Sequence, residues 1–459
     1  MFYGRTEELK SLHQMARMPG FNGAIVYGRR RFGKTTLIKE FAKQFDGPFI
    51  YYQCLRASDS INAKGLIQAA KDVLDNVTVS QNASFTEVLN YLFHRADHEK
   101  MLLVLDEYPY LSGRITIDTE LQSYIDQHRD QSKMKMILAG SSVSIMMTLL
   151  DVSNPLHGRY PYQIKVDAFD YRDAASFYPD APLEDKIAYY SVFGGIPYYL
   201  SLIDPQLGFE ENLKTLLLSE FAPLESEIHS TMKEEYGKIE NATVIMDALS
   251  RGLHSYQDIK RAFENQNTRS DFSYAINSLI DFRFVDKSYA INDHTKKHAY
   301  YTISDNLFAF YYEMIFPNMS RRALLSVDTF YDLFIKEKLF NSFIPKRFEM
   351  ICAEFLVRQN KNGAFDPVLE NLGPYTYNDS KNRINGQFDI VADTKNGPIF
   401  FECKYTKSKV GHAVYHEEIE QIKKAGFTPY RLGFFSRSGF EDFAEKKDCY
   451  CFELADLYR

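Results

Sequence analysis

Cysteine is scarce in this sequence: five residues of this type are scattered over a chain of 459. So small, odd and dispersed a set excludes a disulfide scaffold. Cys449 and Cys451 lie close together, but they have no second pair of ligands nearby, which favours a reduced structural role over a zinc site. The thiols therefore carry no predicted chemistry.

Long apolar runs and an excess of positive charge are also missing. No uninterrupted apolar stretch has the length of a membrane span, and Met1–Lys10 is charged rather than apolar. The net charge of −7 argues against a surface covered with nucleic-acid-binding charge, although a local basic face remains open. We expect a soluble, cytoplasmic protein of about two to four domains.

A phosphate-binding sequence is present near the start. Residues 23–37 read GAIVYGRRRFGKTTL, which places Gly28, Gly33, Lys34 and Thr35 at the fixed positions of G-x-x-x-x-G-K-[ST]. Glycines let successive backbone N–H groups turn inward around phosphate oxygens. We expect the Lys34 ammonium to reach the β- and γ-phosphates and the Thr35 hydroxyl to hold Mg²⁺.

The flanks of this loop support the same interpretation. Ala24–Tyr27 is a short apolar run typical of a buried strand, and Thr36–Phe45 has helical spacing. A strand, a glycine loop and a helix together aim a helix N-terminus at a phosphate. The alternative is an ordinary glycine turn before a basic helix.

Two carboxylates end a second apolar strand. Met101–Glu107 reads MLLVLDE, and ligands gather at the carboxyl ends of buried parallel strands. We expect Asp106 to hold a Mg²⁺-associated water and Glu107 to orient or deprotonate the attacking water. Taken alone, this stretch is more typical of a strand that ends in a solvated Asp-Glu turn.

The next strand and a later loop add two further candidates. Lys135–Ala139 ends in Gly-Ser-Ser, where Ser141 is favoured as a contact to the γ-phosphate or water, while Ser142 could equally cap a helix. Arg159 lies in a loop and is a candidate arginine finger for a neighbouring subunit in a homo-oligomer. A solvated or salt-bridged arginine is the alternative.

The middle of the chain changes from an alternating strand and helix pattern to a helical one near residue 171. Three helical patterns and two strand patterns then predict a winged-helix module: Val244–Leu249, Tyr256–Phe263, Phe272–Asp281, Phe284–Ile291 and His298–Ile303. The residues placed to approach a nucleic-acid groove or its phosphates are Arg269, Ser270, Asp271, Asn277, Lys296 and Lys297. A module that joins domains or binds protein is an equal alternative.

The C-terminal part carries its own constellation. Asp389 lies in a predicted strand, and period-two alternation in the next strand puts Glu402 and Lys404 on one face. Two carboxylates beside a lysine favour a Mg²⁺ site that Glu349, from a preceding helix, would complete. Gln421 is a further possible phosphate or water contact. An exposed salt bridge is the alternative, and the 19 basic and 19 acidic residues of positions 331–459 argue against tight DNA binding.

Taken together, these motifs resemble the archaeal-type ATPases, a group of P-loop NTPases in the AAA+/STAND neighbourhood. The resemblance rests on Gly4-Arg5 with Glu8, Gly28–Thr35, Leu105–Glu107, Gly140–Ser142 and Gly158-Arg159. It implies that the box around Gly4 lies at the adenine end and that Asp106 and Glu107 form the Walker B pair. The nucleotide-binding set is then Gly4, Arg5, Gly28, Phe32, Gly33, Lys34, Thr35 and Thr36.

One branch of that group carries a winged helix followed by a restriction-endonuclease-like domain. The nuclease pattern of Glu, Asp and Glu-x-Lys maps onto Glu349, Asp389, Glu402 and Lys404. The expected fold is therefore α/β: a parallel-sheet P-loop ATPase core over residues 1–170, a helical lid over 171–240, a winged helix over 241–320 and an α/β nuclease-like domain over 321–459. The expected metal ligands are Thr35, Asp106, Glu349, Asp389 and Glu402.

These residues lead to two hypotheses. The first is an ATPase with a Mg²⁺-dependent nuclease domain that acts on DNA, with catalytic residues Asp106, Glu107, Ser141, Arg159, Glu349, Asp389, Glu402 and Lys404. The second is a regulatory ATPase switch that binds DNA or protein and whose C-terminal domain docks without cleaving. A transporter or chaperone component is a weaker third, because membrane segments are missing and a winged helix is expected.

Overall fold

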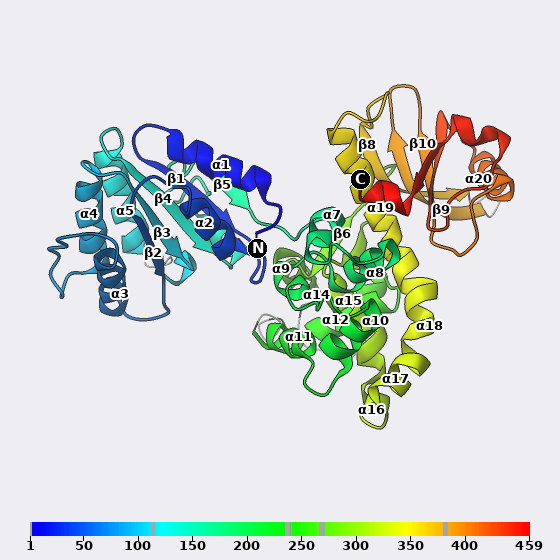
Figure 1. Ribbon diagram of the computed structural model, residues 1–459, viewed down its shortest axis with the longest axis horizontal. Coiled ribbons are helices and arrows are strands. Elements are labelled where there is room, and N and C mark those ends of the chain that lie inside the picture. The colour runs from blue at the N-terminus through cyan, green and yellow to red at the C-terminus, as the bar shows by residue number, and fades with distance from the viewer. Residues whose placement is uncertain (1, 112–114, 235–238, 240, 266–270, 380–383) are drawn as a thin grey trace. The chain divides into compact units, whose positions relative to one another are not determined.

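A computed structural model describes residues 2–111, 115–234, 239, 241–265, 271–379 and 384–459 (Figure 1). The chain divides into two compact units, Met1–Ala168 and Phe169–Arg459. The first boundary falls beside the predicted end of the ATPase core. The further predicted boundaries, at residues 240 and 320, lie inside the second unit and stay predictions.

The first unit is built on a five-stranded sheet in the order β2-β3-β4-β1-β5, with every neighbouring pair parallel. Its strands are β1 Asn22–Tyr27, β2 Phe49–Gln53, β3 Met101–Asp106, β4 Met134–Gly140 and β5 Tyr162–Lys165. Its helices are α1 Thr6–Arg17, α2 Lys34–Ala42, α3 Asp59–Lys71, α4 Phe85–Ala96, α5 Ile115–His128 and α6 Val143–Thr148. The predicted parallel α/β sheet is confirmed.

Alternation along the strands explains why helices cover both faces of this sheet. All six residues of β3 are buried, and Met101, Leu103 and Leu105 join a core formed with α3, α4 and α5. The intervening residues face the side on which α1 and α2 lie (Figure 1). Because the strands are parallel, their carboxyl ends, including Asp106, meet at one edge.

The second unit begins with helices. They are α7 Tyr171–Ala174, α8 Leu183–Phe193, α9 Pro197–Leu200, α10 Phe209–Leu213, α11 Pro223–Glu234, α12 Ala242–Ser250, α13 Tyr256–Glu264 and α14 Phe272–Asp281. An antiparallel hairpin of β6 Val285–Ser288 and β7 Tyr300–Ile303 follows, so β6 is shorter than the predicted strand. The helices after the hairpin are α15 Asn306–Phe310, α16 Met319–Arg322, α17 Val327–Phe334, α18 Lys336–Lys338 and α19 Ile344–Lys361.

A second five-stranded sheet completes this unit, in the order β12-β11-β10-β9-β8. Its elements are β8 Asn371–Asp379, β9 Ile384–Asp393, β10 Ile399–Lys404, α20 His412–Lys424, β11 Arg431–Ser436, β12 Tyr450–Glu453 and α21 Leu454–Leu457. The pairs β8/β9 and β9/β10 are antiparallel, whereas β10/β11 and β11/β12 are parallel. Phe388, Phe400 and Phe434 pack with Ile422 of α20, and α19 also packs against this sheet.

Residues from the two ends of the second unit meet beside α8. The Tyr171 hydroxyl donates to the carbonyl oxygen of Leu457 at 2.7 Å. Nearby, the Glu354 carboxylate of α19 accepts hydrogen bonds from the Tyr171 N–H at 3.1 Å and the Tyr190 hydroxyl at 2.9 Å. Burial raises the pKa of Glu354 to about 7. These contacts tie α19 and α21 to the first helices of the unit.

Local sequence signals account for several element ends, with one exception. Ser84 and Glu87 form a capping box at the start of α4. The turn between α8 and α9 is fixed by glycines: Gly194 has φ +64°, and a Cβ on Gly195 would lie 1.9 Å from the Phe169 carbonyl oxygen. The exception is α1, which begins at Thr6 and follows Arg5, a residue that makes no side-chain cap bond.

Among the helices that the structure describes, none combines the length and apolar character required of a membrane span.

Candidate functional site

The glycine loop connects β1 to α2 as its sequence predicts. Gly33 precedes α2 with φ +84°, in the region that glycine adopts without strain. A Cβ on Gly28 would lie 2.2 Å from the Val166 carbonyl oxygen, so only glycine fits there. The buried Lys34 ammonium donates to the carbonyl oxygens of Gly28 at 2.8 Å and Arg29 at 3.0 Å, which folds the side chain over its own loop.

Thr35 and Asp106, the first of the two predicted Walker B carboxylates, are in direct contact. The Thr35 hydroxyl donates to Asp106 Oδ2 at 2.9 Å, and the Tyr51 hydroxyl of β2 donates to the same oxygen at 2.5 Å. Asp106 Oδ1 accepts from the N–H of Glu107 at 2.9 Å. Burial, followed by the hydrogen bond to Asp106, raises the pKa of Tyr51 well above its ordinary value, so the phenol stays a donor.

Glu107 and Ser141 also meet, although they end different strands. Glu107 Oε2 accepts from the Ser141 hydroxyl at 2.8 Å and from the Ser141 N–H at 3.2 Å. Glu107 has φ +51°, a left-handed conformation that is unusual for a residue with a side chain. The structure thus brings Lys34, Thr35, Asp106, Glu107 and Ser141 to the carboxyl edge of the sheet.

The box at residues 4–8 is tied to the same edge. Gly4 and Arg5 have φ values of +58° and +60°. The Arg5 guanidinium donates to the carbonyl oxygens of Phe32 at 3.1 Å and Asp167 at 2.6 Å, and it pairs with Glu8 at 3.1 Å. Arg5 therefore links the start of the chain to the phosphate loop.

The remaining residues of the predicted nucleotide site differ in their placement. Phe32 is buried in the loop beneath the Arg29 guanidinium, whose carbon lies 5.5 Å from the ring centre. Thr36 is exposed in the first turn of α2.

Arg159 lies away from these residues, just before the amino end of β5. Its guanidinium pairs with both carboxylate oxygens of Asp126, at 3.0 and 2.6 Å. Because β5 runs parallel to β1, this pair lies at the edge of the sheet opposite the phosphate loop. A role toward a second copy of the chain stays a prediction.

The second constellation assembles on β9 and β10. The Lys404 ammonium contacts Glu402 Oε1 at 2.5 Å, so the two side chains share a strand face as period two predicts. Asp389 Oδ2 accepts from the Cys403 N–H at 3.2 Å. Phe401 of β10 pairs with Ile390 of β9 in antiparallel register. The next residue of β10, Glu402, therefore lies opposite the preceding residue of β9, Asp389.

A β-bulge positions Asp389. Gly373 of β8 pairs with Val391 of β9, but Tyr375 pairs with Phe388, so β9 contains one extra residue between these pairs. Such an insertion bends the strand and re-aims a side chain. Asp389 lies within this bulge.

Helices bring two more carboxylates to this cluster. Burial raises the pKa of Glu349, on α19, to about 8, and the charge of Asp389 adds to the effect. Burial and Glu402 likewise raise the pKa of Glu418, on α20, to about 8. Asp389 itself has a pKa raised to about 6, first by burial and then by Glu402. We call Glu349, Asp389, Glu402, Lys404 and Glu418 the carboxylate cluster.

Comparisons with known proteins agree with the first site. Residues 2–203 match a family described as an ATPase domain predominantly from Archaea. Residues 282–420 match a second family, described as archaeal and bacterial proteins of unknown function.

Other similar proteins match larger parts of the chain. An uncharacterized protein of Methanocaldococcus jannaschii is 26% identical over 464 residues and matches both chains over their full lengths. The Walker-type ATPase of Pyrococcus abyssi superposes with a TM-score of 0.54 at 18% identity, over 68% of this chain and 96% of its own, and it shares the fold. The ORC2 protein of Aeropyrum pernix, solved as ADPNP-ADP complexes, gives a TM-score of 0.46 at 12% identity over 70% of this chain and 95% of its own.

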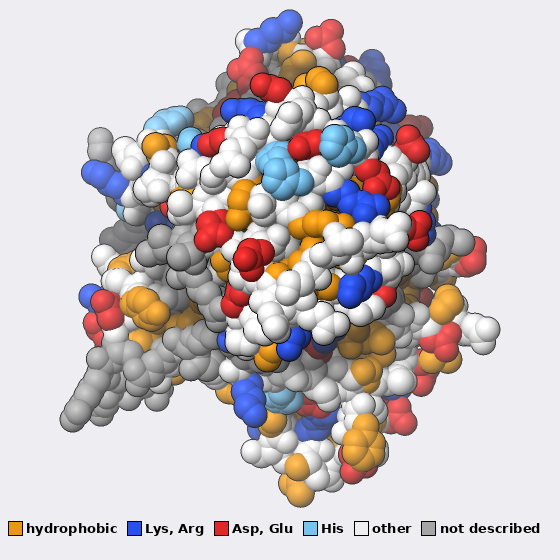
Figure 2. Space-filling view, turned by 90° about the vertical axis from the view of Figure 1, so that its left-hand side faces the viewer, with side chains coloured by type: hydrophobic (Ala, Val, Ile, Leu, Met, Phe, Trp, Pro, Cys, Tyr) orange, Lys and Arg blue, Asp and Glu red, His pale blue; other side chains and the backbone are white. Residues whose placement is uncertain are grey.

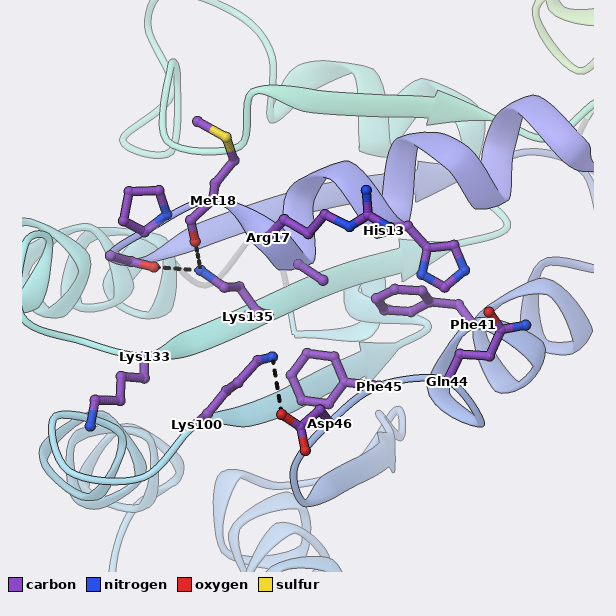
Figure 3. Close-up of a pocket in the computed structure, with 13 residues that line it drawn as sticks. His13, Arg17, Met18, Phe41, Gln44, Phe45, Asp46, Lys100, Lys133 and Lys135 are labelled. Carbon is purple, nitrogen blue, oxygen red and sulfur yellow. Dashed lines mark hydrogen bonds and ion pairs between the residues drawn. The ribbon is translucent and has the colours of Figure 1, made fainter.

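The ATPase domain has a further pocket at the opposite edge of its sheet (Figure 3). Arg17, Lys100, Lys133 and Lys135 line it. The Lys135 ammonium donates to the Met18 and Gly20 carbonyl oxygens, both at 2.6 Å, and burial lowers the pKa of Lys135 to about 8. These lysines lie at or before the amino ends of β3 and β4, so the pocket is distinct from the phosphate loop.

The predicted nucleic-acid contacts of the winged-helix module are only partly described. Arg269 and Ser270 lie outside the described residues. Asp271 caps α14 by accepting from the Ser273 N–H at 2.7 Å, which is a structural role. Three of these predicted contacts are exposed: Asn277, Lys296 and Lys297.

Sequence reasoning missed Tyr51 and Glu418. Tyr51 lies in β2, and its partner Asp106 is 55 residues away in the sequence. Glu418 lies on the helix where Gln421 was favoured; it is buried, whereas Gln421 is half-buried on the next turn. A carboxylate on the same face of α20 as the apolar Ile422 was the available signal.

Proposed function

We propose that this protein hydrolyses Mg²⁺-bound ATP in its ATPase domain and that its C-terminal part is a Mg²⁺-dependent nuclease acting on DNA. The observation that carries the nuclease half is the carboxylate cluster. Four acidic side chains from α19, β9, β10 and α20 converge there beside one lysine.

In the ATPase domain, the residues of the loop would change partners when ATP binds. The Lys34 ammonium would leave the carbonyl oxygens of Gly28 and Arg29 for the β- and γ-phosphates. Thr35 and Asp106 already touch, which suits a shared Mg²⁺, and that ion would neutralise phosphate charge when bound. The Tyr51 hydroxyl would hold Asp106 in place.

Glu107 is the proposed base that orients the attacking water. Ser141 holds Glu107 through its hydroxyl and its N–H, so it would act as a positioning residue rather than as a base. This arrangement supports the choice of Ser141 over Ser142 at the end of β4.

The carboxylate cluster has the chemistry of a site for a hard cation. Mg²⁺ prefers carboxylate and water oxygens, and Asp389, Glu402 and Glu349 would supply the ligands. Burial, followed by the charge of a neighbouring carboxylate, raises the pKa values of Asp389, Glu349 and Glu418, and a bound cation would compensate the negative charge of the cluster. When bound, Mg²⁺ would polarise the phosphoryl group and lower the pKa of a bound water.

The other side chains of the cluster would orient the metal ligands and stabilise charge on the DNA phosphate. The Lys404 ammonium would stabilise negative charge on the scissile phosphate or position the water, and its contact with Glu402 keeps it beside the proposed ligands. Glu418 would hold Glu402. The bulge in β9 would present Asp389 to the same phosphate.

DNA is the proposed polymer because the second unit contains three helices and a hairpin that fit a winged helix. The exposed Lys296 and Lys297 at the hairpin tip would contact phosphates. The face of the first unit that carries α3 and α4 is a weaker candidate for DNA binding, because Figure 2 shows basic and acidic side chains interspersed there. We therefore propose binding through the second unit.

The test is Asp389→Asn with Asp393→Asn as its control. Both residues lie on β9, and Asp393 is exposed. Linear, branched and single-stranded DNA would be incubated with Mg²⁺, with and without ATP. We expect Asp389→Asn to abolish cleavage and to leave ATP hydrolysis unchanged, while Asp393→Asn retains both.

The regulatory switch is the second candidate, favoured by the equal numbers of basic and acidic residues at positions 331–459. Wild-type protein that hydrolyses ATP but cleaves none of these substrates would refute the nuclease and support the switch. ATP-dependent changes in DNA or protein binding would then be the function to measure.

A further inference from the structure

A second group of metal-ligating side chains lies on another part of α20. His412 and His416 are four residues apart on this helix, and the nearby turn at Ala444–Asp448 supplies Glu445. Their ligand atoms all lie within 4.8 Å of one another. We propose that His412, His416 and Glu445 form a binding site for a divalent transition-metal ion, with Zn²⁺ as the best match.

The distances suit one ion held by both rings. The two Nε2 atoms are 2.9 Å apart, and the His412 Nε2 is 3.8 Å from Glu445 Oε1. Two nitrogens that bind one Zn²⁺ at about 2.0–2.1 Å lie roughly 2.9–3.4 Å apart for angles between square and tetrahedral. The rings therefore need little movement to share an ion.

Glu445 carries a second, independent indication. Its Oε2 is buried and has no hydrogen-bond partner among the described residues. A buried carboxylate oxygen costs free energy unless something pairs with it. A cation held between Glu445 and the two rings would compensate that charge.

The donor set selects the class of ion. Imidazole nitrogens suit Zn²⁺, Ni²⁺ and Cu²⁺, whereas Mg²⁺ and Ca²⁺ take oxygen ligands. Two histidines and one glutamate leave a fourth position open for water. Both histidines are exposed, so an ion can enter from solvent.

This site is separate from the carboxylate cluster. His416 and Glu418 are about 200° apart around the helix, so the rings and the buried carboxylate lie on different faces. An ion bound by the rings would join α20 to the turn before β12. It would also fix the helix that supplies Glu418 to the cluster.

Zn²⁺ titration of the full chain by calorimetry, with metal quantified after dialysis, tests the proposal. We compare wild type with the double variant His412→Gln/His416→Gln and with Glu445→Gln. The control is His229→Gln, because His229 is also exposed and also lies 3.8 Å from a glutamate, Glu225. Parallel Mg²⁺ titrations report on the carboxylate cluster.

The double variant should bind one Zn²⁺ fewer per chain than wild type, and its response to Mg²⁺ should not change. Glu445→Gln should lower the affinity of this site for Zn²⁺ by about tenfold or more, because even the loss of a residue that only supports a metal ligand lowers metal affinity by that factor. The control should match wild type. An equal Zn²⁺ stoichiometry in wild type and the double variant, or an equal loss in the control, would overturn the proposal.

Discussion

The two acidic sites of this protein hold their carboxylates in opposite ways. In the ATPase domain, Asp106 accepts hydrogen bonds from Thr35, Tyr51 and the next backbone N–H. In the C-terminal sheet, the half-buried Asp389 and Glu402 lie beside the buried Glu418, and Lys404 is their nearby cation.

This difference separates a site that is organised in advance from one that needs a cation. Donors around Asp106 compensate its charge without any ion. The carboxylate cluster carries more negative charge than Lys404 can balance. We therefore expect substitutions at the two sites to differ in sign as well as in size.

The largest expected effect is on ATP hydrolysis by Lys34→Ala. Losing the only lysine of the loop removes a positive charge from the reacting phosphates, and we expect phosphate release to fall by about a thousandfold or more. DNA cleavage without ATP should persist, because the carboxylate cluster is intact.

Lys43→Ala is the matched control, since Lys43 follows α2 and is exposed in a pair with Glu40. It should hydrolyse ATP as wild type does. A Lys34→Ala protein with a wild-type rate would show that the loop does not carry the reaction.

Glu354 lies between these two kinds of site, because it is half-buried but accepts hydrogen bonds from two donors. Its pKa is raised from 4.5 to about 7, so the folded state binds more protons than the unfolded state between these values. Stability should fall as pH rises through that window, by on the order of 3 kcal/mol from this group. Glu354→Gln should remove this loss and make the protein more stable than wild type above pH 7.

Chemical denaturation of both proteins between about pH 4 and 8 measures this difference. Glu370→Gln, at an exposed glutamate, should keep the wild-type pH profile. Parallel profiles for wild type and Glu354→Gln would contradict the assignment.

Carboxylate-to-amide substitutions test the comparison directly. Without divalent cations, Asp106→Asn should lower the free energy of unfolding by about 1–3 kcal/mol, because three donors lose a charged acceptor. Above about pH 8, where the Glu418 carboxyl is ionised, Glu418→Gln should raise it by about 1 kcal/mol, because one of the crowded charges is removed. Denaturation in EDTA measures both, and two changes of the same sign would refute the contrast.

The smallest expected effect is that of Tyr51→Phe. It removes one hydrogen bond to Asp106 and should lower stability by about 1 kcal/mol. Tyr91→Phe is the control, because the hydrogen bonds of the Tyr91 hydroxyl to the Arg95 guanidinium and the Asn76 carbonyl oxygen are longer, at 3.3 and 3.4 Å. Thermal unfolding of the two variants should differ, and equal melting temperatures would count against a role for Tyr51.

Much of the fold follows from local patterns. In α4, for example, the apolar spacing of Phe85–Ala96 and the capping box of Ser84 and Glu87 indicate the same helix. The strand ending in Asp106 is continuous and apolar because both faces of its sheet are covered. The P-loop spacing located the ATPase site.

Contacts between side chains that are far apart in the sequence could not be predicted. Arg159 pairs with Asp126, 33 residues away, and no local pattern connects them. The bulge at Asp389 depends on how β8 and β9 align, which is a property of two strands. Glu418 reaches the cluster only because α20 packs with Ile422 against the sheet.

The hydrogen bond between Tyr171 and the Leu457 carbonyl has a consequence for biosynthesis. The second unit begins to leave the ribosome near residue 169, but the partner of Tyr171 is made almost 290 residues later. The helices around α8 therefore lack their contact with Leu457 until that residue has left the exit tunnel. The ATPase domain, whose sheet is complete by Lys165, can fold while the rest of the chain is still being translated.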